Sequence, residues 1–211
     1  MALVGRQFPN IAVDAINSKG ENIKINILEE AKKGKKVLLF WYPKDFTFVC
    51  PTEILAFQEA LSAFEDRNTM VIGASVDTAE VHYAWLNTEK NNGGIQGVTF
   101  PLLADTNRNL STVLDILDIE EGEYDEDNDI ILATGSYVTY RATYLIDEEG
   151  KIFHESVNDM PLGRNVNEYL RMVDAYTHIQ ENGEVCPANW QKGDDAMNAT
   201  RDGVADYLSK H

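Results

Sequence analysis

Two cysteines are the side chains in this sequence best suited to covalent chemistry. Cys50 and Cys186 are the only cysteines among 211 residues, and neither lies in a C-x-x-C pair. The four histidines are scattered and give no recognisable zinc-ligand spacing, so we expect no metal site. Three interpretations stay open at this point: a reactive thiol, a transient disulfide, or two inert thiols packed as small hydrophobes.

The residues around Cys50 favour a reactive thiol. Cys50 follows the apolar run of residues 37–42 (VLLFWY), which predicts a buried strand, and it precedes Pro51 and a helical pattern over residues 52–66. We therefore expect Cys50 at the start of a helix, where backbone N–H groups and the helix dipole favour a thiolate. A helix end contributes only about 0.3 to 1 kcal/mol, so a cation or further donors should lie nearby.

Two residues shortly before Cys50 fit the same chemistry. Thr47 lies three residues earlier and can offer a hydroxyl group from the same turn. Pro43 can make the approach to the sulfur rigid and help to keep water out. The pattern P-x-x-x-T-x-x-C therefore supplies a shielding ring, a hydroxyl donor and a nucleophile.

The rest of the chain predicts an alternation of strands and helices. We expect a strand over residues 70–76, helices over 79–90 and 107–117, a hairpin of 142–146 with 152–156, and a long amphipathic helix over 166–180. This order predicts a mixed sheet with helices on both faces. His82 and His178 fall within helices and are interpreted as ordinary polar positions, and Trp85 as a core residue.

Charge and composition exclude several classes of function. The chain has 18 Lys and Arg against 35 Asp and Glu, a net charge of −17, which disfavours binding to nucleic acid. The apolar run of residues 37–42 is far too short to cross a membrane, and no export signal is recognisable. We therefore expect a cytoplasmic protein whose thiols are kept reduced. Residues 118–129 hold eight acidic side chains, match no calcium-loop spacing and predict a solvated excursion.

The run FWYPKDFTFVCPTE closely resembles the active-site motif of typical two-cysteine peroxiredoxins, a group that includes the bacterial alkyl hydroperoxide reductase C proteins. The resemblance extends through LVGRQFPN, HYAWLN, FPLLAD, YRATYLIDEEGKI and GEVCPANW to nearly the whole chain. It implies a thioredoxin-like α/β sandwich, in which a central mixed sheet is flanked by helices and preceded by a β-hairpin. The peroxidase domain would span residues 1–181, and a C-terminal arm residues 182–211.

The resemblance also implies a thiol peroxidase that reduces hydrogen peroxide and organic hydroperoxides without metal or organic cofactor. Cys50 would be the peroxidatic cysteine, and Thr47 would orient the peroxide. Pro43 would shield the site, and Arg141 would be the cation required beside the sulfur. Glu53 and Arg164 would hold Arg141 in place as a supporting network.

Cys186 would be the resolving cysteine, on the neighbouring subunit, and would form a disulfide with the oxidised Cys50. The resemblance implies a homodimer, assembled into a decamer of five dimers. A thioredoxin-like protein or a flavoprotein disulfide reductase would reduce the disulfide. The alternative function is a holdase chaperone or a peroxide-signalling relay.

Two features depart from the family pattern. Peroxiredoxins that are prone to over-oxidation carry a GG-[LIV]-G loop and a C-terminal Tyr-Phe, whereas this chain has residues 93–96 (GGIQ) and 207–208 (YL). The acidic stretch before Arg141 is longer than usual, which predicts a surface insertion.

Overall fold

The computed structural model describes residues 2–211, apart from the side chains at positions 120, 121, 133 and 134. The described chain divides into two compact units, one ending at Arg164 and the other covering residues 165–211. This division places the long helix with the C-terminal segment, and the domain boundary expected between residues 181 and 182 stays a prediction.

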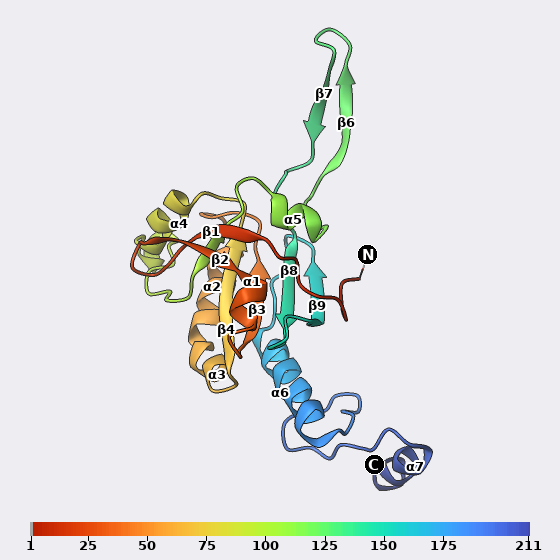
Figure 1. Cartoon of the computed structure of the whole chain (residues 1–211). Coiled ribbons are helices and arrows are strands. Elements are labelled where there is room, and N and C mark those ends of the chain that lie inside the picture. Colours follow the sequence, from red (N-terminus) through yellow and green to blue (C-terminus); the bar gives the residue numbers. More distant parts are fainter. Residues whose placement is uncertain (1) are drawn as a thin grey trace. The chain divides into compact units, whose positions relative to one another are not determined.

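A seven-stranded mixed sheet forms the centre of the first unit (Figure 1). In spatial order its strands are β2 (Asn22–Asn26), β1 (Ala12–Ile16), β5 (Leu102–Ala104), β4 (Thr69–Ser75), β3 (Lys36–Trp41), β8 (Arg141–Ile146) and β9 (Ile152–Asn158). The β5-β4-β3 part is parallel, and the remaining pairs are antiparallel. The expected N-terminal hairpin is β1 with β2, and the expected late hairpin is β8 with β9.

Strand β3 contains most of the apolar run of residues 37–42, and its burial explains that run. Successive side chains of a strand point to opposite faces of the sheet, and every residue of β3 is buried. Leu39 and Trp41 belong to the core cluster on one face, together with residues of β1, β4, β5 and β8. Phe40 points to the other face and stacks on Phe57 of helix α2, with ring centroids 4.1 Å apart. Helices therefore cover β3 on both sides.

The helices of the first unit are short. They are α1 (Ile27–Ala31), α2 (Cys50–Glu59), α3 (Leu61–Glu65), α4 (Ala79–Leu86), the 3-10 helix η1 (Lys90–Asn92) and α5 (Asn109–Val113). The single helix expected over residues 52–66 is interrupted at Ala60, whose N–H bonds to both Ala56 and Gln58. The helix expected over 107–117 shrinks to α5 because Arg108 and Asp115, on either side, take left-handed backbone conformations.

The acidic stretch forms half of a hairpin. Strand β6 (Glu120–Asp125) pairs with β7 (Ile130–Thr134) in a separate two-stranded sheet, which extends from the region of α5 and β8 in Figure 1. The acidic stretch, expected to be a solvated excursion, thus lies in a β-ribbon whose pairing register shifts between Glu120 and Glu123.

The second unit contains α6 (Val166–Asn182), a loop segment and α7 (Arg201–Lys210). Asn165 caps the start of α6 by accepting a hydrogen bond from the backbone of Asn167, and Gly183 ends the helix with φ of 68°. Within the described residues, no helix is both long and apolar enough to cross a bilayer.

Candidate active site

Cys50 is the first residue of α2, as predicted, and only 1% of its surface is exposed. Strand β3 ends at Trp41, and the connecting segment, whose Pro43 is buried, leads directly into the helix. Pro51 occupies the first helical turn, where its missing N–H costs no hydrogen bond. The sulfur therefore lies at the positive end of a ten-residue helix, in a position that favours negative charge.

Thr47 lies against the sulfur. Its Oγ1 is 2.9 Å from Cys50 Sγ and 2.8 Å from the carbonyl oxygen of Lys44. A hydroxyl has one hydrogen to donate, so it can serve the carbonyl or the sulfur, but not both. With a neutral thiol, the S–H can donate to Oγ1 while Oγ1 donates to Lys44. With a thiolate, the hydroxyl donates to the sulfur.

Arg141 supplies the cation that the sequence required. It begins β8, its side chain is buried, and its Nη1 lies 3.4 Å from Cys50 Sγ and 2.7 Å from Glu53 Oε2. Its Nε donates to the carbonyl oxygen of Met160 at 2.6 Å. Three acceptors, two on α2 and one in the loop after β9, therefore fix the plane of the guanidinium beside the sulfur.

Glu53 joins Arg141 to a second guanidinium. Arg164 donates from Nε to Glu53 Oε1 and from Nη2 to Oε2, both at 2.8 Å, and its backbone N–H donates to Oε1 at 3.0 Å. Two buried positive charges thus share one carboxylate, which leaves one positive charge without a partner inside the cluster. A thiolate at Cys50 would complete the charge balance, because buried charges are stable only when they are paired.

Cys186 belongs to the second unit. It is partly buried and unpaired with another cysteine, and its Sγ makes a long contact of 3.7 Å with the carbonyl oxygen of Ala175. Burial raises the pKa of the Cys186 thiol and nearby Glu184 adds to this effect, while Arg171 opposes it. Cys186 therefore lies in surroundings that favour the neutral thiol.

His82 is not the ordinary polar position expected from the sequence. It is completely buried: Nδ1 lies 2.7 Å from Asp45 Oδ2, and Nε2 lies 3.0 Å from the carbonyl oxygen of Leu103. The carbonyl oxygen can only accept, so Nε2 donates to it, and Nδ1 faces the carboxyl group of Asp45. Burial raises the pKa of Asp45, although the hydrogen bond to His82 opposes this. The pair attaches the loop before Cys50 to α4.

The carboxylate of Asp77 holds the same loop at a second point. It accepts hydrogen bonds from the backbone N–H of Asp45 at 2.8 Å and from the hydroxyl of Ser75 at 2.9 Å. No local pattern predicts the contact with Asp45, because it joins residues 32 positions apart. Trp85 is buried as predicted, and its Nε1 donates to the carbonyl oxygen of Gly93.

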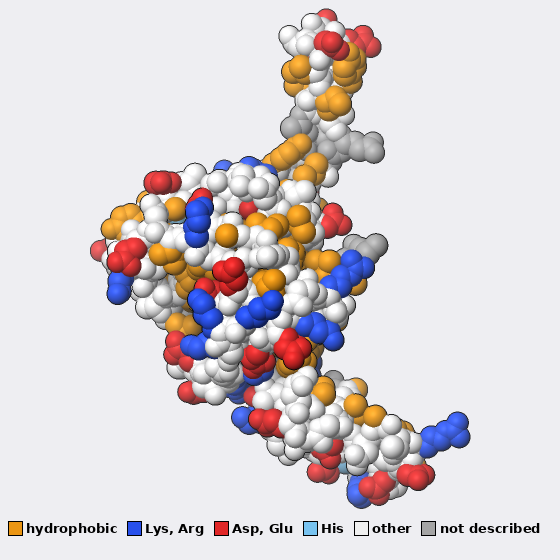
Figure 2. All heavy atoms as spheres, viewed as in Figure 1, with side chains coloured by type: hydrophobic (Ala, Val, Ile, Leu, Met, Phe, Trp, Pro, Cys, Tyr) orange, Lys and Arg blue, Asp and Glu red, His pale blue; other side chains and the backbone are white. Residues whose placement is uncertain are grey.

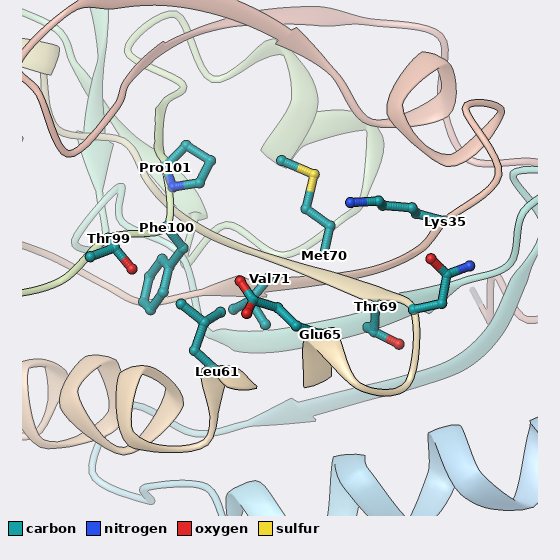
Figure 3. Close-up of a pocket in the computed structure, with 10 residues that line it drawn as sticks. Lys35, Leu61, Glu65, Thr69, Met70, Val71, Thr99, Phe100 and Pro101 are labelled. Atoms are coloured by element: carbon teal, nitrogen blue, oxygen red, sulfur yellow. The ribbon is translucent and has the colours of Figure 1, made fainter. Parts of the chain in front are cut away.

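A hollow of about 350 Å³ lies elsewhere on the first unit. Figure 3 shows its lining, which comes from α3, the start of β4 and residues 99–101. Strands β3 and β4 are parallel, so the start of β4 and the loop that follows β3 lie at opposite ends of the sheet. The hollow is therefore separate from Cys50. Among the described residues, no group of three His, Cys, Asp or Glu side chains could hold a metal ion.

Comparison with known proteins agrees with this geometry. Residues 4–155 match the AhpC/TSA family, and residues 175–210 match the C-terminal domain of 1-Cys peroxiredoxin. The chain is a member of the AhpC/TSA family of peroxiredoxins. Peroxiredoxins are thiol peroxidases, so this chain is an enzyme that reduces peroxides, as the sequence predicted.

Individual peroxiredoxins match over nearly their full length. Alkyl hydroperoxide reductase C of Helicobacter pylori (strain ATCC 700392 / 26695) is 42% identical over 210 residues, which are 99% of this chain and 98% of that protein. Peroxiredoxin-1 of Gekko japonicus is 39% identical over 100% of this chain and 97% of its own. The reduced 2-Cys peroxiredoxin of Plasmodium vivax matches with a TM-score of 0.88 and 39% identity, over 99% of this chain and 100% of that one. The thioredoxin-like fold expected from the sequence is therefore confirmed.

Proposed function

We propose that Cys50 is the peroxidatic nucleophile of this peroxiredoxin. The observation that carries the proposal is the position of its sulfur, which contacts both the hydroxyl of Thr47 and the guanidinium of Arg141. The thiolate attacks one peroxide oxygen, the O–O bond breaks, and negative charge develops on the other oxygen. Arg141 and Thr47 stabilise that charge, and the leaving oxygen takes a proton to give water or an alcohol. Cys50 becomes a sulfenic acid.

Cys186 is the proposed resolving cysteine. Its thiolate attacks the sulfur of the Cys50 sulfenic acid, hydroxide leaves and takes a proton to become water, and a disulfide forms. We propose that the two cysteines come from different subunits of a homodimer, itself part of a decamer of five dimers. An external dithiol, on a thioredoxin-like protein or a flavoprotein, then reduces the disulfide and restores both thiols.

The remaining roles follow from position. Pro43 is buried beside the turn that carries Thr47, where it can shield the sulfur from water. Glu53 and Arg164 hold Arg141 and act through it. Hydrogen peroxide and small organic hydroperoxides are the proposed substrates, in agreement with relatives named alkyl hydroperoxide reductase C. We propose a cytoplasmic location, where a reducing environment keeps the two free cysteines ready for this cycle.

Non-reducing electrophoresis after one equivalent of hydrogen peroxide tests this cycle. We expect wild-type chains to form a covalent dimer, because each Cys50 is resolved by Cys186 of another subunit. Cys186→Ser should consume the first equivalent but remain a monomer on the gel, with a sulfenic acid at Cys50. A disulfide within one chain, or a covalent dimer in Cys186→Ser, would contradict resolution between subunits.

The raised pKa of Cys186 predicts how the rate of disulfide formation with oxidised Cys50 depends on pH. Only the thiolate attacks a sulfenic acid, and burial makes the thiolate of Cys186 scarcer at neutral pH than that of an ordinary cysteine. The rate of disulfide formation should therefore rise close to tenfold per pH unit between about pH 6 and about pH 8.5. Rapid mixing of pre-formed sulfenic acid at each pH, followed by acid quench, measures this rate.

The titration of Cys186 also affects how much of Cys50 is over-oxidised to sulfinic acid. Excess peroxide competes with Cys186 for the sulfenic acid, so the yield of sulfinic acid should fall as the pH rises. Mass spectrometry of Cys50 gives this yield. If the rate of disulfide formation stayed constant or fell between about pH 6 and about pH 8.5, ionisation of Cys186 would not limit disulfide formation.

A further inference from the structure

The β6–β7 hairpin carries an unusual surface. Its exposed hydrophobic side chains include Ile131 (73% exposed), Tyr124 (60%), Ile130 (48%) and Leu132 (44%). Figure 2 shows hydrophobic side chains along this ribbon and acidic side chains gathered at its tip. A two-stranded ribbon cannot bury such residues by itself, and contiguous exposed apolar surface marks interaction sites.

The register separates the two faces of the ribbon. Tyr124 pairs with Ile131, so these two side chains share one face, which is apolar. Glu123 pairs with Leu132 and Asp125 with Ile130, so the opposite face alternates carboxylates with aliphatic side chains. A Cβ atom at Gly122 would collide with the side chain of Ile131, so glycine allows that side chain to lie across β6.

Both ends of the ribbon are fixed by hydrogen bonds. At the root, Asp118 accepts from the hydroxyl of Ser136 at 2.6 Å and from that of Tyr140 at 3.0 Å. At the tip, the hydroxyl of Tyr124 donates to Asp129 at 2.5 Å, and the side chain of Asn128 donates to Asp125 at 2.8 Å. The hairpin is thus a preformed surface, so a partner loses little free energy in ordering it.

The outer edge of β7 is the open side of this surface. In the described part of the chain no third strand pairs with β7, whose sequence IILAT contains neither charge nor proline. Strand β6, with the sequence EEGEYD, is protected by its charges, whereas an uncharged edge such as β7 is a template for another strand. We propose that this edge binds an extended segment of a partner protein in which apolar residues alternate with Lys or Arg.

The two faces define that alternation. A strand added beside β7 would place every second side chain next to Ile131, on the apolar face. The others would pass over Ile130 and Leu132 toward Glu123 and Asp125, which lie one strand further away. Lys and Arg suit these positions, because their aliphatic stems can cover the apolar side chains while their charged heads reach the carboxylates.

Charge also selects a foreign partner over a second copy of this chain. Residues 118–129 carry eight acidic side chains in a chain of net charge −17. Two such hairpins would repel each other, whereas a basic segment is attracted before it docks. The hydrogen bond from Asn128 lowers the pKa of Asp125, so this carboxylate keeps its negative charge.

Fluorescence anisotropy with a labelled ten-residue peptide of alternating Val and Lys tests the proposal on the full-length chain. We expect affinity to fall at least about tenfold when residues 120–134 are replaced by a short Gly-Ser turn. Glu123→Gln should weaken binding, while Glu126→Gln in the turn, which removes the same charge outside the strand pairing, should change it much less. Peroxide consumption, which requires none of these residues, verifies that each variant is folded.

Two control peptides separate strand pairing from simple attraction between opposite charges. One has the same composition with all the lysines grouped together, and the other is N-methylated at alternate residues so that it cannot donate along one edge. Both should bind at least about tenfold more weakly than the alternating peptide. Equal binding of the grouped peptide, or unchanged binding to the shortened chain, would overturn the proposal. Hairpin-dependent self-association in sedimentation experiments without peptide binding would also overturn it, in favour of a second copy.

Discussion

Replacing Arg141 by Lys should slow the oxidation of Cys50 by hydrogen peroxide about 10²- to 10³-fold. A lysine keeps the positive charge but cannot reach Cys50 Sγ, Glu53 and the carbonyl of Met160 at the same time, as the guanidinium does. Loss of one oriented donor at a developing anion has an effect of this size in other enzymes. Stopped-flow measurement of the second-order rate constant gives the effect directly.

Arg201→Lys is the matched control for this prediction, because Arg201 is an exposed arginine at the start of α7. Its rate constant should equal that of the wild type. If Arg141→Lys reacted as fast as Arg201→Lys, the positive charge alone would suffice, and the oriented guanidinium would have no catalytic role.

Glu53→Gln should destabilise the folded chain by about 3 to 5 kcal/mol. The change preserves the shape of the side chain but removes the negative charge that two buried guanidinium groups share. Breaking a buried ion pair on one side leaves an uncompensated charge in a low-dielectric environment. For a chain of this length the loss corresponds to a decrease in Tm of roughly 6 to 20 °C, measurable by calorimetry at fixed protein concentration.

Glu59→Gln provides the comparison, because Glu59 is exposed at the end of the same helix. Its effect on Tm should be within about 2 °C, as expected for a surface substitution. Glu53→Gln should also slow the oxidation of Cys50, since Arg141 loses its anchor. A Glu53→Gln chain as stable as Glu59→Gln would mean that the two arginines do not depend on the shared carboxylate.

Much of this fold could be predicted from local sequence. The run VLLFWY is apolar at every position because both faces of β3 are covered, and Pro51 marks the start of α2. The same two signals place Cys50 at the end of a strand and the start of a helix. The weak effect of a helix end on a thiolate predicted a cation nearby, and Arg141 lies 3.4 Å from the sulfur.

Other features depend on contacts that a local pattern does not contain. His82 looked like an ordinary polar residue of a helix, but folding brings it to Asp45, 37 positions away, and buries both. The acidic charge of residues 118–129 predicted a solvated loop and not a strand. The strand depends on pairing with IILAT, which lies beyond the charged segment. In each case tertiary pairing outweighs the local signal.

Cys50 Sγ lies between the hydroxyl of Thr47 and the guanidinium of Arg141, and we propose that it attacks peroxide from this position. The rate constant for the reaction of the fully reduced chain with hydrogen peroxide, compared with that of free cysteine under the same conditions, tests it most directly. We predict a reaction at least about 10³-fold faster than that of free cysteine, because two oriented donors act on the leaving oxygen. A rate equal to that of free cysteine, or an equally fast reaction in Cys50→Ser, would contradict the claim.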